Sequence, residues 1–239
     1  MTPAPWIVLP TYNEATNLEP IVRAVLAALP AARVLVVDDD SPDGTGAIAD
    51  RLAAELDGVE VLHRPVKRGL GPAYVAGFAR ALDAGATHVF EMDADFSHDP
   101  ADLPRLLGAG ADVALGSRYV PGGGIENWHW RRRAVSRAGC LYAQAVLGVR
   151  VRDLTGGFKC FTADALRAVD YASVRSLGYA FQVELTYRAL LAGLRVTELP
   201  IVFHERREGE SKMTGRIAVE AAWLVPGLRW AHARRRLCR

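Results

Sequence analysis

The sequence has few cysteines and no long apolar run. Its 239 residues include three cysteines, an odd number without the spacing of a metal site, which favours a reducing compartment over a disulfide framework. The longest apolar stretch, residues 217–228, contains an acid and a proline and falls short of the about 20 residues that span a bilayer. The N-terminus lacks a basic region followed by a long apolar stretch, so we expect no signal peptide. These absences favour a cytoplasmic protein.

Net charge and the common phosphate-binding motifs do not identify a partner. The formal net charge of +2 implies no electrostatic partner for the molecule as a whole. Arginines gather at 131–133 and near the C-terminus, but no basic and aromatic pattern recurs, so we expect no nucleic-acid binding. Neither G-x-G-x-x-G after the first strand nor G-x-x-x-x-G-K-S/T is present, which removes the usual support for dinucleotide-binding and P-loop proteins.

Apolar periodicity predicts alternating strands and helices in the first half of the chain. Near-continuous apolar runs predict strands at 6–9, 33–37, 59–62, 89–92 and 113–115, and helical spacing predicts helices at 18–29, 45–56 and 72–84. Thr16 and Glu19 match a capping box for the first helix. This order predicts an α/β fold whose mostly parallel central sheet has helices on both faces.

The second half reads as an extension of the same domain. We expect a helix at about 132–147, a strand at 158–161, a helix at 179–191 and a strand at 195–203, followed by a polar loop and a last amphipathic helix. In sheets of this kind ligands bind beyond the carboxyl ends of the strands. The polar motifs of this chain fall at those ends.

Asp93 and Asp95 follow the predicted strand 89–92. Two carboxylates two residues apart can both reach one hard cation, and Mg²⁺ prefers one or two carboxylates plus substrate phosphate oxygens. A cation would also offset the repulsion among Glu91, Asp93 and Asp95. The other interpretation of the motif is a solvated loop at the end of a strand.

Other polar groups have two interpretations each. Tyr12 and Glu14 could stack on and hydrogen-bond a base, or form a turn. The acids at 38–40 could accept hydrogen bonds from a ribose or a base, or form an Asx-turn.

Arg132 and Ser136 lie four residues apart on one helix face and with Arg118 could hold a phosphate, or they form a solvated surface. The loop from Arg206 to Lys212 could close over a diphosphate, or be a surface connection.

Seven motifs stand in the order and spacing of one family: PTYNE, DDDSPDGT, GLGPAYVAGF, MDADFSHDP, GSRYVPGG, DLTGGFKCF and ERREGESKM. The sequence resembles the inverting family-2 glycosyltransferases of GT-A fold, and within them the dolichol-phosphate or polyprenol-phosphate mannosyltransferases. The resemblance runs from about Ile7 to Met213. It implies a GT-A catalytic domain over residues 1–213, with a nucleotide-binding half at about 1–117 and an acceptor half at about 118–213. Residues 214–239 are expected to form an amphipathic basic helix.

The resemblance also implies roles for individual residues. The nucleoside would be held by Pro10, Tyr12, Glu14, Val37 and Asp39. The diphosphate and a Mg²⁺ or Mn²⁺ ion would be contacted by Asp93, Ala94 and Asp95, with Ser97 as a third position toward the metal. The nucleotide sugar would also touch Arg118, Arg206 and Lys212, and the acceptor phosphate would lie near Arg132 and Ser136. Catalysis would then depend on Asp95, Arg118, Arg132 and Ser136.

Two residues depart from the pattern of the family. Asp40 stands where the group often has glycine, and adds a charge at the nucleoside end. Ser97 stands where some members have a metal-binding glutamine, and a serine is the weaker ligand.

The implied reaction moves mannose from GDP-mannose to a polyprenyl monophosphate with inversion. A phosphate monoester has a second pKa of ~6, so the acceptor is already a dianion at neutral pH and needs no general base. Relatives with hydroxyl acceptors commonly carry paired acids near the helix that contains Glu184, which here has no adjacent acid. The alternatives are a lipid-phosphate transferase that uses a UDP-sugar, a transferase with a soluble acceptor, and a non-catalytic nucleotide-sugar-binding protein.

The acceptor is embedded in a membrane, whereas the chain has no predicted span. Trp223, Leu224, Leu228 and Trp230 precede a terminal arginine cluster, which suits an amphipathic helix at an anionic membrane surface. The other interpretations are a helix packed on the catalytic domain and a separate membrane-anchoring subunit. We expect a peripheral enzyme on the cytoplasmic face of the membrane.

Overall fold

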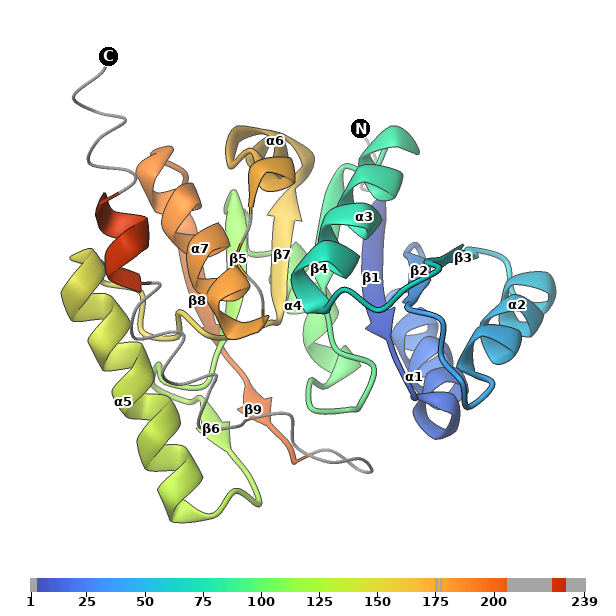
Figure 1. Cartoon of the computed structure of the whole chain (residues 1–239), viewed down its shortest axis with the longest axis horizontal. Helices are drawn as coiled ribbons and strands as arrows, with labels where there is room; N and C mark the ends of the chain where they lie inside the picture. Colours follow the sequence, from blue (N-terminus) through green and yellow to red (C-terminus); the bar gives the residue numbers. More distant parts are fainter. Residues whose placement is uncertain (1–3, 175, 177, 206–224, 231–239) are drawn as a thin grey trace.

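The computed structural model describes residues 4–174, 176, 178–205 and 225–230. One sheet has the strand order β3-β2-β1-β4-β7-β5-β8, and a second small sheet pairs β6 with β9 (Figure 1). The strands are β1 (Pro5–Thr11), β2 (Arg33–Asp38), β3 (Val59–His63), β4 (His88–Glu91), β5 (Val113–Ser117), β6 (Gly124–Ile125), β7 (Lys159–Thr162), β8 (Val196–Pro200) and β9 (Val202–Phe203). Within the large sheet, β7 runs antiparallel to β4 and β5, and the other pairs are parallel. The predicted mostly parallel sheet is confirmed.

Helices cover both faces of the sheet (Figure 1). They are α1 (Ala15–Ala28), α2 (Thr45–Glu55), α3 (Leu70–Asp83), α4 (Leu103–Leu107), α5 (Trp130–Leu147), α6 (Ala163–Ala168) and α7 (Gly178–Leu191), with 3₁₀ turns at Pro100–Asp102 and Tyr171–Ser173. Ile7 and Leu9 of β1 share one core with α1, α2 and α4, whereas Trp6 and Val8 share the other with α3, α6 and α7. This alternation follows from the period of two along a strand.

Close packing of α3 on the sheet depends on Gly77. A Cβ at this position would lie 2.4 Å from Val8 Cγ1, well inside van der Waals contact. The absence of a side chain therefore sets the distance between α3 and β1, and so the position of the residues that begin α3.

The start of α1 differs from the predicted capping box. The helix begins at Ala15 with Glu14 as N-cap, so Thr16 lies within the first turn. The Glu14 amide donates to Thr45 Oγ1 (2.9 Å) and the Ala15 amide donates to Asp43 Oδ2 (3.0 Å). The amides of Glu14 and Ala15 are thus satisfied by Thr45 at the start of α2 and by Asp43 in the loop before it, which a local capping motif does not anticipate.

The predicted strand at 195–203 is interrupted in the structure. β8 ends at Pro200 beside β5, and β9 begins at Val202 beside β6. Between them, Ile201 is buried and its amide donates to Ser117 O (3.1 Å). The apolar run at 195–203 therefore contributes one strand to each sheet, and the buried side chain of Ile201 lies between the two strands.

The C-terminal segment is described only in part. Residues 214–224 and 231–239 of the predicted amphipathic helix lie outside the described residues, as do Arg206 and Lys212. Residues 225–230 are helical and lie beside α5 and α7, where Val225 and Leu228 join an apolar cluster with Leu147 and Tyr187 (Figure 1). No helix within the described ranges is long and apolar enough to cross a membrane.

Candidate active site

A pocket of about 300 Å³ opens at the ends of the strands where the polar motifs were predicted to meet. Nine of the residues singled out in the sequence line it: Pro10, Tyr12, Glu14, Asp39, Asp93, Ala94, Asp95, Arg118 and Arg132. Val37, Ser97 and Ser136 are described but do not line it, and Val37 is buried in the core beside α3. Any contact of Val37 with a nucleoside would therefore involve its backbone.

One end of the pocket is lined by the ring of Tyr12, the carboxylate of Asp39 and the cation Lys67, and Arg64 pairs with the carboxylate from outside the lining. The ammonium of Lys67 lies 3.4 Å from the centroid of the Tyr12 ring, and Arg64 Nη1 donates to Asp39 Oδ1 (2.6 Å). Burial raises the pKa of Asp39, and Arg64 opposes this shift. An aromatic face that accepts a cation also suits a stacked base. Arg64 and Lys67 were not predicted as site residues, although the run of basic residues before Gly69 was their signal in the sequence.

The backbone at Asp40 suits the glycine that the family resemblance led us to expect at this position. Asp40 has a φ of 57°, in the left-handed region that favours glycine. Its side chain is exposed and does not line the pocket. The extra charge at this position therefore lies outside the pocket.

The acidic loop after β4 holds Asp95 in a fixed position. Asp95 is only 2% exposed, and its Oδ1 accepts a hydrogen bond from the amide of Ser97 (3.0 Å). Burial raises the pKa of Tyr74, which lies behind this loop, and the carboxylates of Asp93, Glu91 and Asp95 raise it further. Asp93 and Asp95 both line the pocket, so their carboxylates place negative charge at its wall.

The donor set of this loop fits a divalent cation that completes its shell with substrate oxygens. The described part of the chain holds no group of three His, Cys, Asp or Glu side chains that could bind a metal by themselves. A divalent cation at this loop would be held by the two carboxylates of Asp93 and Asp95, the number Mg²⁺ takes when substrate phosphates provide the rest. The hydroxyl of Ser97 is buried without a hydrogen-bond partner among the described residues, so it offers a further oxygen nearby.

Arg118 is held by a buried ion pair that the sequence analysis missed. Its Nε and Nη2 donate to the two carboxylate oxygens of Asp153 at 2.7 Å each, and Nη2 also donates to Thr155 Oγ1 (2.8 Å). Burial lowers the pKa of Arg118, but Asp153 outweighs that effect and raises it; the same pairing lowers the pKa of Asp153 against its own burial. The guanidinium is therefore a fixed positive charge at the wall of the pocket. The only signal in the sequence was that Asp153 opens the DLTGGF motif.

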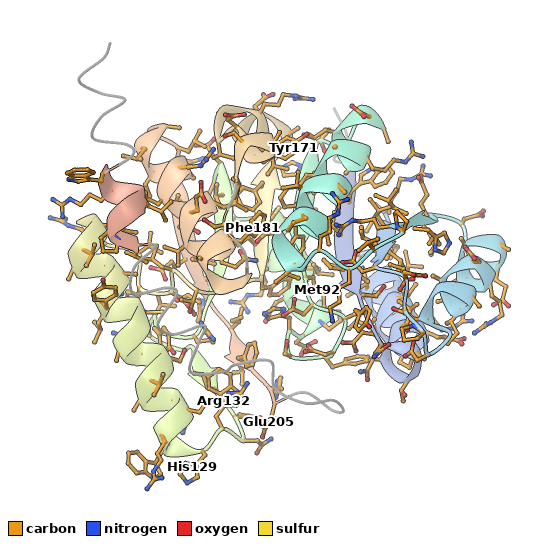
Figure 2. All side chains as sticks on the ribbon, viewed as in Figure 1. Met92, His129, Arg132, Tyr171, Phe181 and Glu205 are labelled. Carbon is orange, nitrogen blue, oxygen red and sulfur yellow. The ribbon has the colours of Figure 1, made fainter. Side chains whose placement is uncertain are left out.

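Arg132 and Ser136 both lie on α5, as predicted, but only Arg132 reaches the pocket. The Arg132 guanidinium lies 3.9 Å from the centroid of the Trp128 ring, and Nη1 donates to Glu205 Oε1 (3.1 Å). Figure 2 labels Arg132 and Glu205 near the start of α5. Ser136 Oγ accepts from the hydroxyl of Tyr119 (2.7 Å). Ser136 therefore does not reach the pocket directly.

Glu184 is engaged in a structural ion pair on α7. Its Oε1 accepts from Arg188 Nε and Nη2 (2.9 and 2.6 Å), and its Oε2 accepts from Ser176 Oγ. Glu184 does not line the pocket, whereas Gln182 from the same helix does. On α7 the pocket therefore meets a neutral amide in place of a carboxylate.

Comparisons with known proteins place the chain in a family. The model of glycosyl transferase family 2 matches residues 6–170, and the chain belongs to that family. It is 50% identical over 223 residues to polyprenol monophosphomannose synthase of Mycolicibacterium smegmatis, covering 92% of this chain and 84% of the relative. It is 49% identical over 230 residues to undecaprenyl-phosphate mannosyltransferase of Micrococcus luteus, covering 95% of this chain and 94% of the relative. The family predicted from the motifs is confirmed.

Solved structures share the fold at low sequence identity. Glucosyl-3-phosphoglycerate synthase of Mycobacterium tuberculosis, in complex with phosphoglyceric acid, has a TM-score of 0.70 and 18% identity, over 95% of this chain and 81% of that one. A mannosyltransferase of Pyrobaculum calidifontis, in complex with GDP-Man and Mn²⁺, has a TM-score of 0.62 and 17% identity, over 98% of this chain and 65% of that one. These likenesses confirm the GT-A architecture.

Proposed function

We propose that this protein transfers mannose from GDP-mannose to a polyprenyl monophosphate with inversion, giving a polyprenyl β-mannosyl phosphate. The observation that carries the proposal is that a single pocket gathers the Tyr12 end, the Asp93–Asp95 loop and the cations Arg118 and Arg132. The names of the two relatives at 50% and 49% identity support mannose as the sugar and a polyprenyl phosphate as the acceptor.

Each part of the pocket has a role in this proposal. Tyr12 stacks on the base, with Pro10, Glu14, Asp39 and the backbone of Val37 around the nucleoside. Asp93 and Asp95 hold the divalent cation, with Ala94 beside the diphosphate and Ser97 as a neighbouring oxygen. The bound Mg²⁺ or Mn²⁺ supplies positive charge for the leaving diphosphate. Arg206 and Lys212, which lie outside the described residues, are proposed to complete this positive clamp.

The acceptor phosphate is proposed to enter beside Arg118 and Arg132. Arg118 is fixed by Asp153, so it contributes an oriented positive charge without reorganising. Ser136 supports this end of the pocket from the next turn of α5. The attacking oxygen belongs to a phosphate with a second pKa of ~6 and needs no base, which agrees with the engagement of Glu184 by Arg188.

The exposed side of α5 is proposed to contact the membrane that holds the acceptor. Trp130, Val135, Leu141 and Tyr142 are exposed on this helix, and Trp230 of the adjoining C-terminal segment is 70% exposed. Arginines accompany them, which suits an interface with anionic lipid. We place this contact on the cytoplasmic face, and a separate membrane-anchoring subunit is the competing arrangement.

Transfer of radiolabelled sugar into an organic-extractable lipid tests the proposed function. GDP-mannose and UDP-glucose are offered in parallel with polyprenyl phosphate, with Mg²⁺, with Mn²⁺ and with a chelator. We expect metal-dependent labelling from GDP-mannose alone. Labelling from UDP-glucose alone would overturn the proposed donor, and absence of transfer from both by a protein that still binds nucleotide would favour a non-catalytic role.

A further inference from the structure

Three buried polar side chains form a connected group behind the pocket. Glu91 ends β4, Lys159 begins β7 directly opposite it, and Gln182 lies on α7. Glu91 and Lys159 are fully buried and Gln182 is 2% exposed. Lys159 Nζ lies 3.4 Å from Glu91 Oε2 and 3.3 Å from the backbone oxygen of Gln182, and it also donates to Gln182 Oε1.

The ammonium of Lys159 determines which way the Gln182 amide faces. An ammonium group has hydrogen atoms to donate and no lone pair to accept with, so Gln182 presents Oε1 to it. The two N–H groups on Nε2 then face away from Lys159. Burial raises the pKa of Glu91, and Lys159 and the Gln182 side chain oppose this shift.

The Nε2 group of Gln182 is buried at the wall of the pocket. Nε2 has no hydrogen-bond partner of normal geometry among the described residues, and Gln182 lines the pocket. Opposite it lies Gly157, where an added Cβ would be 3.4 Å from Nε2. The glycine therefore leaves the amide open on the side of the pocket. A buried donor without a partner costs free energy, and a ligand oxygen would recover it.

We propose that Gln182 Nε2 donates a hydrogen bond to a phosphate oxygen of a bound substrate, with Lys159 and Glu91 as positioning residues. The inference rests on the proposed function, which places a diphosphate and a phosphate monoester in this pocket. Lys159 polarises the amide through Oε1 and strengthens its N–H groups as donors. An ionised phosphate oxygen only accepts hydrogen bonds, so it pairs with an amide N–H, whereas a carboxylate at this position would repel it.

Gln182→Glu is the most informative substitution. It keeps the shape of the side chain and the acceptor for Lys159, and it removes the N–H groups. Because a charge-assisted hydrogen bond is lost and a repulsion is added, kcat/KM should fall about 10- to 100-fold or more. A fall confined to the acceptor KM assigns the bond to the acceptor phosphate. An equal fall in GDP affinity, measured by calorimetry with Mg²⁺, assigns it to the diphosphate.

Two further variants separate the lost donor from other effects. Gln182→Met removes the N–H groups without adding charge, and its kcat/KM should fall about tenfold. Gln144→Glu makes the same chemical change at the only other glutamine of the chain, outside the pocket, and should stay near wild-type activity. Rates for Gln182→Glu within threefold of wild type would overturn the proposal. They would mean that the side chain meets a sugar hydroxyl, which can donate to a carboxylate, and not a phosphate oxygen, which a carboxylate repels. Full activity of Gln182→Met would overturn it as well.

A measurement on the wild-type chain does not depend on how the variants fold. Labelling glutamine with ¹⁵N gives side-chain amide signals from Gln144 and Gln182, and Gln144→Glu identifies which pair is which. One proton of the Gln182 pair should move downfield when GDP with Mg²⁺, or a short-chain polyprenyl phosphate, saturates the pocket. Unchanged Gln182 signals with both ligands bound would overturn the inference. Failure of the wild type to transfer mannose would instead overturn the proposed function alone.

Discussion

The carboxylate of Asp95 is held in place by its own loop before any ligand binds. The Ser97 amide fixes one oxygen and the side chain is almost fully buried. Such preorganisation suits a metal ligand, because no reorganisation is needed when the cation and diphosphate arrive. The motif predicted this carboxylate from the sequence, since its spacing and its place after an apolar strand are local features.

Asp95→Ala should reduce kcat by at least about 100-fold, because the charge that holds the cation beside the leaving group is lost. Steady-state mannose transfer with saturating Mg²⁺ measures this loss. Asp99→Asn is the matched control, since Asp99 is exposed in the same loop and caps a 3₁₀ turn. Wild-type kcat for Asp95→Ala would contradict the metal role.

Asp153→Asn should destabilise the fold by about 3–5 kcal/mol, because it leaves the Arg118 guanidinium buried without its ion-pair partner. Urea unfolding followed by circular dichroism measures the change. Asp164→Asn removes a surface partner of Arg167 and should cost about 0–1 kcal/mol. Equal free energies of unfolding for the two variants would show that the ion pair of Arg118 and Asp153 does not stabilise the fold.

The ion pair of Arg118 and Asp153 also shows why some site residues could not be predicted from the sequence. Its two members are separated by 35 residues and meet only because β5 and the loop before β7 lie together in the fold. Lys67 over Tyr12 is a second such case, since it joins loops that follow different strands. The charges of these residues are visible in the sequence, but only the tertiary structure brings the partners together.

At the scale of elements, apolar periodicity predicted the long strands and helices well. α1, α2, α3, α5 and α7 all lie where helical spacing placed them. The short helices α4 and α6 were not predicted, and they have too few turns to show a period. The break between β8 and β9 was missed because both halves are apolar and only pairing to different sheets divides them.

The double substitution Trp130→Ser with Leu141→Ser tests the proposed membrane contact of α5. Each removes an exposed apolar side chain, so sedimentation with anionic vesicles should fall about tenfold or more if both insert. GDP affinity should stay unchanged, because neither residue lines the pocket. Val66→Ser, at an exposed apolar residue in the loop between β3 and α3, is the control. Unchanged vesicle binding would favour a separate membrane-anchoring subunit.

At the scale of the whole molecule, the pocket joins segments from almost the full length of the described chain. Residues from Pro10 to Phe203 line it, so ligand binding links the two halves of the domain. The sequence predicted this convergence from one topological rule, that ligands gather beyond the carboxyl ends of parallel strands. It did not predict the antiparallel insertion of β7, which places Lys159 opposite Glu91.

Nucleotide and metal together should therefore stabilise the whole molecule. At a ligand concentration of 100 times Kd, binding adds about 2.7 kcal/mol of stability. For a chain of this size that corresponds to a rise in Tm of about 5–10 °C. Thermal denaturation with GDP and Mg²⁺ measures the rise, and a chelator should remove most of it. A rise of the same size with UDP, or one insensitive to the chelator, would contradict the proposed ligands.

The location of Mn²⁺ in crystals grown with GDP tests the central claim most directly, because anomalous scattering places the ion without assumptions about the chain. The account predicts one peak bound by the carboxylates of Asp93 and Asp95 and by diphosphate oxygens, with the base stacked on Tyr12. A peak away from these two carboxylates, or GDP bound outside the pocket, would contradict it.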